Sequence, residues 1–191
     1  RARAVRGTRP DRVVARTAAG SRVSVGTFGT GVRVTVRPLS HRVGGRDGGL
    51  LADLWGPSPP AYRGTTVPGF PNLFLLAGPN TGIGHTSLVF MIECQLAYVL
   101  GALAHLRRRE IAAVDVRPER HAAWVADVDA QMASTVWNSG GCTSWYLDES
   151  GRNSALWPTF TYRFRRHVRA FDPDAYDELP LSPARVTGMA R

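Results

Sequence analysis

The stretch Gly69-Phe-Pro-Asn-Leu-Phe-Leu-Leu-Ala-Gly-Pro-Asn-Thr-Gly-Ile-Gly-His-Thr-Ser87 has the pattern of a short strand, a glycine-rich turn and the start of a helix. Leu73 to Ala77 is an uninterrupted apolar run of strand length, with proline-containing turns on both sides. The glycines at positions 78, 82 and 84 allow the backbone to turn sharply and to approach a ligand, because glycine has no Cβ.

The residues after this turn predict a helix whose first N–H groups point back into it. Thr86 or Ser87 can cap that helix. Free amides, together with the positive end of the helix dipole, form a site suited to an anion or a polar ligand. An ordinary strand–turn–helix corner has the same pattern, however, so spacing alone leaves both interpretations open.

The positive charge of this 191-residue chain is confined to its first 48 residues. That segment holds 11 of the 24 basic residues, all of them arginine, and only Asp11 and Asp47 as acids, whereas residues 49–191 carry no net charge. A nucleic-acid-binding surface normally combines clustered basic residues with aromatic ones on a folded face. Residues 1–22 contain no aromatic residue, so we expect no specific nucleic-acid binding.

Cysteine usage and hydropathy indicate a cytoplasmic protein without a metal site. Cys94 and Cys142 lie far apart, in no Cys-x-x-Cys pair and no His/Cys cluster, which predicts reduced thiols and no zinc site. No signal peptide is recognisable at the start of the sequence. The most apolar segment, residues 88–106, includes Glu93 and His105, and we interpret it as a buried core helix rather than a transmembrane segment.

The chain is predicted to consist of an arginine-rich arm, a central α/β part and a tail. Residues 1–25 read as disordered or mis-specified sequence, residues 26–179 as the folded part, and residues 180–191 as a frayed tail. Along the chain we expect short strands at Val23–Val25, Val32–Val36 and Ile111–Val116. We expect helices near Leu50–Trp55, from Leu88 to the arginines at 107–109, and from Pro118 to about Ser134.

The region from Thr135 to Asp177 is rich in aromatic residues and turn formers, which is typical of a binding surface. The alternative is a long ordered loop whose tryptophans, Trp137, Trp145 and Trp157, cover the core. The arginines at 163, 165, 166 and 169 alternate with Phe164 and Val168, and we expect them to form a solvated edge. Asp148 and Glu149 are adjacent in a polar loop and are expected to face water.

From Gly45 to Tyr176 the sequence resembles the C-terminal third of class B flavoprotein monooxygenases. Within that class it is most similar to the Baeyer–Villiger type and its 4-hydroxyacetophenone monooxygenase-like relatives. The motifs that carry the resemblance are Gly64-Thr-Thr-Val-Pro-Gly-Phe-Pro-Asn-Leu-Phe-Leu-Leu-Ala-Gly-Pro-Asn80, Gly84-His85-x-Ser87, Trp137-Asn-Ser-Gly-Gly-Cys-Thr-Ser-Trp-Tyr-x-Asp148, Gly151-Arg-Asn153 and Trp157-Pro158.

This resemblance implies an α/β fold: the C-terminal portion of a flavoprotein with two dinucleotide-binding domains, incomplete alone. It implies FAD and NADPH as cofactors and a ketone or aldehyde as substrate, with insertion of one oxygen atom from O2 or oxidation of a heteroatom. The FAD contacts it implies are Gly78, Pro79, Asn80, Gly84 and Ser87, with His85 as a further contact to flavin or substrate. Trp145 and Asn153 resemble residues of the mobile loop that contacts the nicotinamide cofactor.

The sequence also departs from the family pattern. No Gly-x-Gly-x-x-Gly fingerprint follows a strand, and Gly26-Thr-Phe-Gly-Thr-Gly31 lacks both the following helix and the downstream acid. We therefore expect a truncated or frame-shifted product whose N-terminal flavin and NADPH domains lie elsewhere, and we assign no catalytic residue. The alternative is a non-catalytic remnant or a cofactor-holding module that needs a separate flavin domain.

Overall fold

The computed structural model describes residues 43–84, 86–139, 146–148 and 150–181, and the backbone of two short strands nearer the N-terminus. These strands, β1 (Val14–Arg16) and β2 (Arg22–Ser24), pair in antiparallel orientation. The chain divides into two compact units, Arg1–Val36 and Arg37–Arg191. The strand expected at Val32–Val36 lies outside the described residues, as does Cys142.

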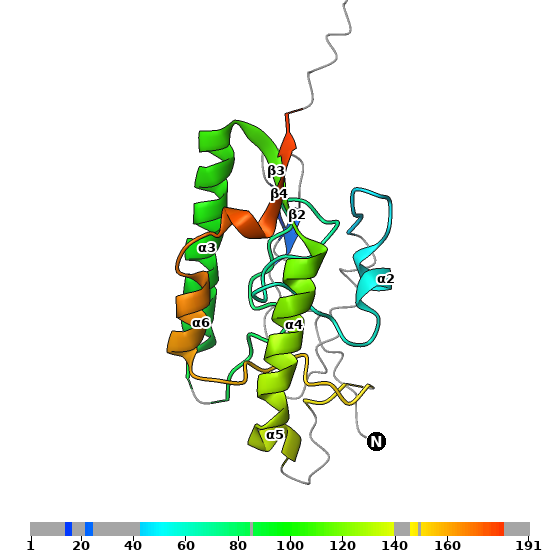
Figure 1. The fold of residues 1–191 in the computed structure, drawn as a ribbon, viewed down its shortest axis with the longest axis vertical. Coiled ribbons are helices and arrows are strands. Elements are labelled where there is room, and N and C mark those ends of the chain that lie inside the picture. Colours follow the sequence, from blue (N-terminus) through cyan, green and yellow to red (C-terminus); the bar gives the residue numbers. More distant parts are fainter. Residues whose placement is uncertain are drawn as a thin grey trace, which may run out of the picture. The chain divides into compact units, whose positions relative to one another are not determined.

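The second unit contains four helices of five residues or more and one two-stranded antiparallel sheet among its described residues (Figure 1). The helices expected near Leu50–Trp55, from Leu88 to the arginines at 107–109 and from Pro118 to about Ser134, and the strand at Ile111–Val116, are confirmed. The helix that starts at Leu88 is buried on one face only, however, so the expectation that it is a buried core helix is correct for that face alone. In chain order the elements are α2 (Leu51–Trp55), α3 (Leu88–Arg109), β3 (Ile111–Val116), α4 (Pro118–Ala133), α5 (Val136–Ser139), α6 (Thr161–Val168), the 3-10 turn η1 (Pro173–Ala175) and β4 (Tyr176–Pro180).

The long helix α3 begins and ends at the residues that the sequence indicated. Ser87 is its N-cap, and the Ser87 hydroxyl accepts a hydrogen bond from the amide of Val89 at 3.2 Å. Glu110 ends the helix in the left-handed conformation, with φ of 53°. Three arginines occupy the last turn, where positive charge is favoured by the helix dipole.

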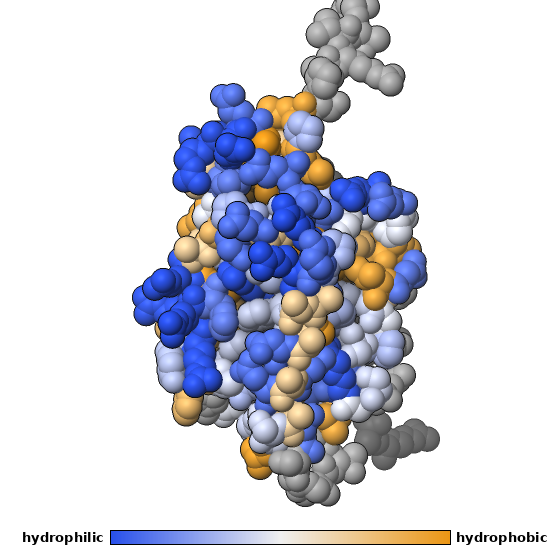
Figure 2. Space-filling model, in the orientation of Figure 1, coloured by the Kyte–Doolittle hydropathy of each residue, from blue (hydrophilic) through white to orange (hydrophobic). Residues whose placement is uncertain are grey.

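The core of this unit lies between α3, α6 and the β3–β4 sheet. Met91 and Tyr98 of α3, Phe164 of α6 and Tyr176 of β4 are at most 2 % exposed and belong to one apolar cluster. Phe164 and Val168 are four residues apart, which places both on the same face of a helix. The arginines of this stretch are exposed, as expected, but the stretch is not an edge: it forms α6, which buries Phe164 and Val168 in the core and has a strongly hydrophilic outer surface (Figure 2).

Asp172 ties α3 to the segment that follows α6. Its carboxylate accepts hydrogen bonds from the hydroxyls of Tyr98 and of Tyr62, the latter at 2.7 Å. Arg63 forms an ion pair with the same carboxylate at 2.9 Å, and its side chain is only 15 % exposed. Burial raises the pKa of both tyrosines above the ordinary value, followed by the hydrogen bond to Asp172 for Tyr62 and by the neighbouring Tyr176 and Asp172 for Tyr98, while Arg63 opposes the shift. Both hydroxyls therefore remain hydrogen-bond donors at neutral pH.

The strand β4, which sequence analysis did not predict, pairs with β3 in antiparallel register, with Val116 opposite Tyr176 and Asp115 opposite Asp177. Its sequence contains two acids and ends in proline, so it lacks the usual strand composition. Partners in neighbouring elements hold both acids: Asp177 pairs with Arg117 at 3.0 Å, and Glu178 with His105 at 2.7 Å.

The predicted strand at Leu73–Ala77 is wrong: the structure has no strand there. The backbone of the segment makes four isolated hydrogen bonds. The amide of Leu73 donates to the carbonyl of Phe70 at 3.1 Å, and the amide of Leu75 to the carbonyl of Thr65 at 2.7 Å. The amide of Ala77 donates to Gln95 Oε1 at 2.9 Å, and Gln95 Nε2 donates to the carbonyl of Leu75 at 3.4 Å. A strand needs a partner strand for its backbone groups, and no described residue pairs with this segment in a ladder. The apolar run has strand composition without a sheet to join.

Candidate functional site

The glycines of the turn before α3 are required by the packing of the chain itself. A Cβ on Gly78 would lie 2.2 Å from the carbonyl oxygen of Gly64, and a Cβ on Gly82 would lie 2.8 Å from that of Ala155. Both distances are shorter than any side chain tolerates. Two of the three glycines that the sequence offered for ligand approach are thus explained by close backbone contacts within the protein.

Asn80 joins this turn to the loop that precedes α6. It has a positive φ of 55° and is 6 % exposed. Its side-chain amide donates to the carbonyls of Asn153 at 2.8 Å and of Leu156 at 3.1 Å, and its backbone amide donates to the carbonyl of Ser154 at 2.8 Å. The Asn80 side chain is therefore engaged within the protein, and the turn and the loop behave as one unit.

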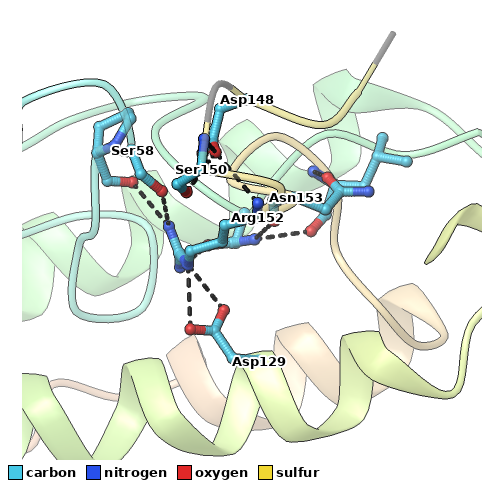
Figure 3. A network of polar contacts seen from close by, with 9 residues as sticks. Ser58, Asp129, Asp148, Ser150, Arg152 and Asn153 are labelled. Atoms are coloured by element: carbon cyan, nitrogen blue, oxygen red, sulfur yellow. Dashed lines mark hydrogen bonds and ion pairs between the residues drawn. The ribbon is translucent and has the colours of Figure 1, made fainter. Parts of the chain in front are cut away.

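Arg152 completes this junction (Figure 3). Its Nε donates to both carboxylate oxygens of Asp129 on α4, at 2.8 and 3.0 Å, and its Nη2 donates to Asn80 Oδ1 at 3.0 Å. Its Nη1 reaches the hydroxyl of Ser58 at 3.3 Å. In the sequence Arg152 is recognisable only as part of the motif Gly151-Arg-Asn153, because local sequence does not indicate which distant residues an arginine contacts.

Asp148 shapes the start of the same loop. Its Oδ1 accepts hydrogen bonds from the amide and the hydroxyl of Ser150, at 2.9 and 2.6 Å, and from the amide of Arg152 at 3.1 Å. Burial alone would raise the pKa of Asp148, but these hydrogen bonds and one with Ser58 bring it below the ordinary value. The expectation that Asp148 faces water is wrong, because this half-buried carboxylate holds a turn; Glu149 lies outside the described residues.

Asn153 is the one proposed nicotinamide contact that the structure describes. It is 1 % exposed, and its Oδ1 accepts a hydrogen bond from the amide of Leu156 at 3.0 Å. Its Nδ2 is buried and finds no partner among the described residues. Buried polar groups are nearly always hydrogen-bonded, so the side-chain Nδ2 of Asn153 is a donor that could bind an acceptor atom of a ligand.

A hollow of about 540 Å³ lies beside Gly84. Trp137 forms one wall, and a Cβ on Gly84 would lie 2.9 Å from the Trp137 ring. Trp157 is 4 % exposed and belongs to the core, whereas Trp137 is 36 % exposed, so of these two tryptophans only Trp157 fits the alternative of a core cover. The lining is about equally polar and apolar, and its polar side chains are Gln131, Ser134, Thr135, Thr159 and Arg163.

The structure brings together five of the eight predicted cofactor contacts. Gly78, Pro79, Asn80 and Gly84 follow one another along the turn, and Asn153 lies against it through the Asn80 amide. Ser87 serves as the cap of α3, while His85 and Trp145 lie outside the described residues. In the described part of the chain, no group of three or more His, Cys, Asp or Glu side chains could hold a metal ion.

Comparison with known proteins identifies relatives by sequence. The chain is 47 % identical over 165 residues to a Baeyer–Villiger monooxygenase of Pseudomonas aeruginosa, covering 86 % of this chain and 31 % of the relative. It is 46 % identical over 167 residues to a Baeyer–Villiger monooxygenase of Streptomyces coelicolor, covering 85 % and 32 %. The chain thus spans about a third of the length of these relatives. No family model matches the chain.

Solved structures give the same result. An oxidized steroid monooxygenase bound to NADP superposes with a TM-score of 0.61 at 26 % identity, covering 71 % of this chain and 26 % of that protein. A cyclohexanone monooxygenase from Rhodococcus sp. Phi1 bound to NADP+ superposes with a TM-score of 0.62 at 26 % identity, covering 72 % and 26 %. By sequence and by fold, the chain belongs to the Baeyer–Villiger flavoprotein monooxygenases, as a partial α/β unit of that fold.

Proposed function

We propose that this chain supplies the C-terminal part of an FAD- and NADPH-dependent monooxygenase. Such an enzyme inserts one oxygen atom of O2 next to the carbonyl of a ketone or aldehyde, or oxidises a heteroatom. The observation that carries the proposal is the junction of the turn at Gly78–Gly84 with the loop around Asn153. This junction joins the two segments for which the family resemblance implies flavin and nicotinamide contacts.

The described residues fit a dinucleotide cofactor in two respects. The backbone around Gly84 borders an open hollow, whereas the backbone at Gly78 and Gly82 is closed off by neighbouring carbonyls. The unpaired Nδ2 of Asn153 is a buried donor beside the same turn. We assign flavin contact to Gly84, Pro79 and Ser87, and nicotinamide contact to Asn153 and Trp145. His85 is assigned as a further contact to flavin or substrate. The bound flavin would supply the oxygen chemistry, and these residues would position it and exclude water.

The hollow beside Gly84 is the proposed approach for substrate. Its apolar walls, Trp137, Leu156, Trp157 and Phe160, suit a ketone or aldehyde with an apolar body. Polar side chains line the rest of the hollow, so a neutral substrate there would combine burial of its apolar body with hydrogen bonds to the lining.

A flavin titration tests this function. FAD fluorescence would be followed as the chain is added alone, and again with the part of the P. aeruginosa relative that this chain does not match. We expect saturable quenching with the combined proteins, weakened at least tenfold by Gly84→Leu. Gly49→Leu is the matched control, because nothing lies within 4 Å of a Cβ at Gly49.

The outcome separates the enzyme from the alternative function. If the combined proteins bind FAD and then oxidise NADPH in the presence of a cyclic ketone, the chain is an enzyme part. If FAD is never retained, alone or combined, the proposed function is wrong and the non-catalytic interaction module takes its place.

A further inference from the structure

Helix α3 is apolar on two opposite faces. One face packs into the core through residues such as Met91 and Tyr98, both 0 % exposed. The opposite face carries a continuous row that we call the outer stripe: Val89, Ile92, Leu96, Val99, Leu100 and Leu103. Because a helix has 3.6 residues per turn, the three- and four-residue spacing of this row places it on one side, away from the core face.

The outer stripe is open to solvent in this chain. Leu100 is 64 % exposed, Val89 61 %, Leu103 44 % and Leu96 42 %. A helix that is apolar all round is normally buried on all sides within a larger protein. A contiguous exposed apolar surface of this kind marks an interaction site.

A second observation shows what kind of layer is needed. The segment Leu73–Ala77 leads into α3 with strand composition and, among the described residues, without a strand partner; its Leu76 is 40 % exposed. An uncovered helix face beside an apolar segment of strand composition that joins no sheet is what an α/β unit shows when one of its layers is absent. The two Baeyer–Villiger monooxygenases are long enough to contain such a layer outside the matched region, because this chain spans only 31 % and 32 % of their lengths.

We propose that the outer stripe of α3 is the docking surface for the part of a flavoprotein monooxygenase that this chain does not span. This inference rests on the proposed function for the identity of the partner. The partner presents an apolar layer and a strand for Leu73–Ala77, on the same polypeptide or on another. Apolar contact with the stripe then buries side chains that this chain leaves in water.

Two other occupants fit the surface less well. By length and composition α3 could cross a membrane. However, its inner face is committed to protein contacts: Gln95 donates to the carbonyl of Gly64 at 2.8 Å and to the hydroxyl of Thr65 at 3.1 Å. A second copy of the chain would cover the stripe, but its described residues offer no additional strand to pair with Leu73–Ala77.

Association with the unmatched part of the P. aeruginosa relative tests the proposal. The full chain would be co-expressed with that part and the mixture analysed by size-exclusion chromatography with light scattering. We expect a one-to-one complex. The double variant Leu96→Glu/Leu100→Glu should weaken it at least tenfold, because it places charges in the stripe. The control is Ala97→Glu, which adds the same charge at an exposed position of α3 outside the stripe, and it should leave the complex intact.

A chimera gives an independent readout if the double variant misfolds. Residues 43–181 of this chain would replace the matching third of the relative, and the melting temperature of the soluble product would be measured with and without each substitution. We expect the Leu96→Glu/Leu100→Glu chimera to melt lower than the Ala97→Glu chimera. Equal melting temperatures, or an insoluble chimera with the native stripe, would overturn the proposal.

The remaining outcomes also decide the question. A defined dimer of the chain alone that persists when the relative's part is present would overturn the inference, as would flotation with phosphatidylcholine–phosphatidylglycerol vesicles that the double variant abolishes. Because light scattering detects the complex whether or not flavin is bound, a complex without FAD would support the docking surface while contradicting the proposed function.

Discussion

At the scale of single residues, Arg152 joins segments that are far apart in the sequence. Its guanidinium contacts Asp129 of α4, Asn80 of the glycine turn and Ser58 of the proline-rich stretch. A planar group with five donors is suited to such a junction, whereas lysine offers a single charged centre. Arg152 therefore helps to fix the position of the loop that carries Asn153, together with the hydrogen bonds of Asn80.

Replacing Arg152 by alanine tests this dependence. The change removes the Nε–H that both carboxylate oxygens of Asp129 share, and the donor to the buried Asn80 Oδ1. With the Arg152 and Asp129 side chains 18 % and 39 % exposed, solvent screens part of this interaction. We expect the free energy of unfolding to fall by about 2 kcal/mol. Chemical denaturation followed by circular dichroism measures it.

The control for this prediction is Arg117→Ala. Arg117 pairs with Asp177 at 3.0 Å, but the two side chains are 42 % and 54 % exposed. Exposed pairs of this kind contribute little, and we expect a change within about 0.5 kcal/mol. Equal effects of the two substitutions would show that Arg152 is an ordinary surface arginine.

His167 makes stability depend on pH. Its ring lies against the rings of Trp124 and Trp157 while the residue as a whole remains exposed, and this partial burial, followed by the nearby Arg63, lowers its pKa below the ordinary 6.5. The unfolded chain therefore takes up a proton first as the pH falls. Neutral His167 therefore stabilises the folded state fully above about pH 6.5. This stabilisation is lost as the pH drops below that value towards the lowered pKa of His167 in the folded state.

We therefore expect the melting temperature to fall between about pH 7 and pH 5. His167→Gln should make the decline shallower without abolishing it, because burial lowers the pKa of His121 as well. Differential scanning fluorimetry across this range would measure both curves. A decline of the same slope in wild type and variant would assign the pH dependence to other groups.

At the scale of elements, the sequence predicted what depends on local pattern. The bounds of α3 and α4 follow from Ser87, the terminal arginines and Pro118, which act within one turn of a helix end. β4 and the failure of Leu73–Ala77 to form a strand were not predictable, because strand formation is decided by a partner distant in sequence.

The candidate site shows the same division. The turn and the loop were both identified from motifs, but their junction through Asn80 and Arg152 spans about 70 positions of sequence and has no local signature. Helix α6 was missed because alternating arginine and apolar residues over a short stretch also fit a strand period, and only the pair Phe164 and Val168 distinguishes the helix.

The packing of α6 is tested by a pair of aromatic substitutions. Phe164 is fully buried against α3 and Trp157, whereas Tyr162 on the same helix is 61 % exposed. We expect Phe164→Ala to cost about 3 kcal/mol through lost burial and a cavity, and Tyr162→Ala to cost about 0.5 kcal/mol. Urea titrations of the two variants would give the comparison. Similar costs would mean that α6 is not anchored by the face that carries Phe164 and Val168.

At the scale of the whole molecule, apolar side chains among the described residues are buried on one side and exposed on another. The core of residues 43–181 is closed on the side of α6, β3 and β4, while the outer stripe of α3 lies in water. Burial on one side and exposure on the other explains why α3 has the composition of a membrane-spanning helix, although its inner face is a protein core.

This surface predicts how the chain behaves alone. An environment-sensitive dye such as anilinonaphthalene sulfonate should bind the native chain and fluoresce strongly, because the outer stripe offers contiguous apolar area. Leu96→Glu/Leu100→Glu should reduce the signal at least twofold, whereas Ala97→Glu should leave it unchanged. Circular dichroism on each variant would verify that helix content is retained. Equal fluorescence from all three proteins would place the dye elsewhere, and the exposed side chains of α3 would then have to be covered in solution.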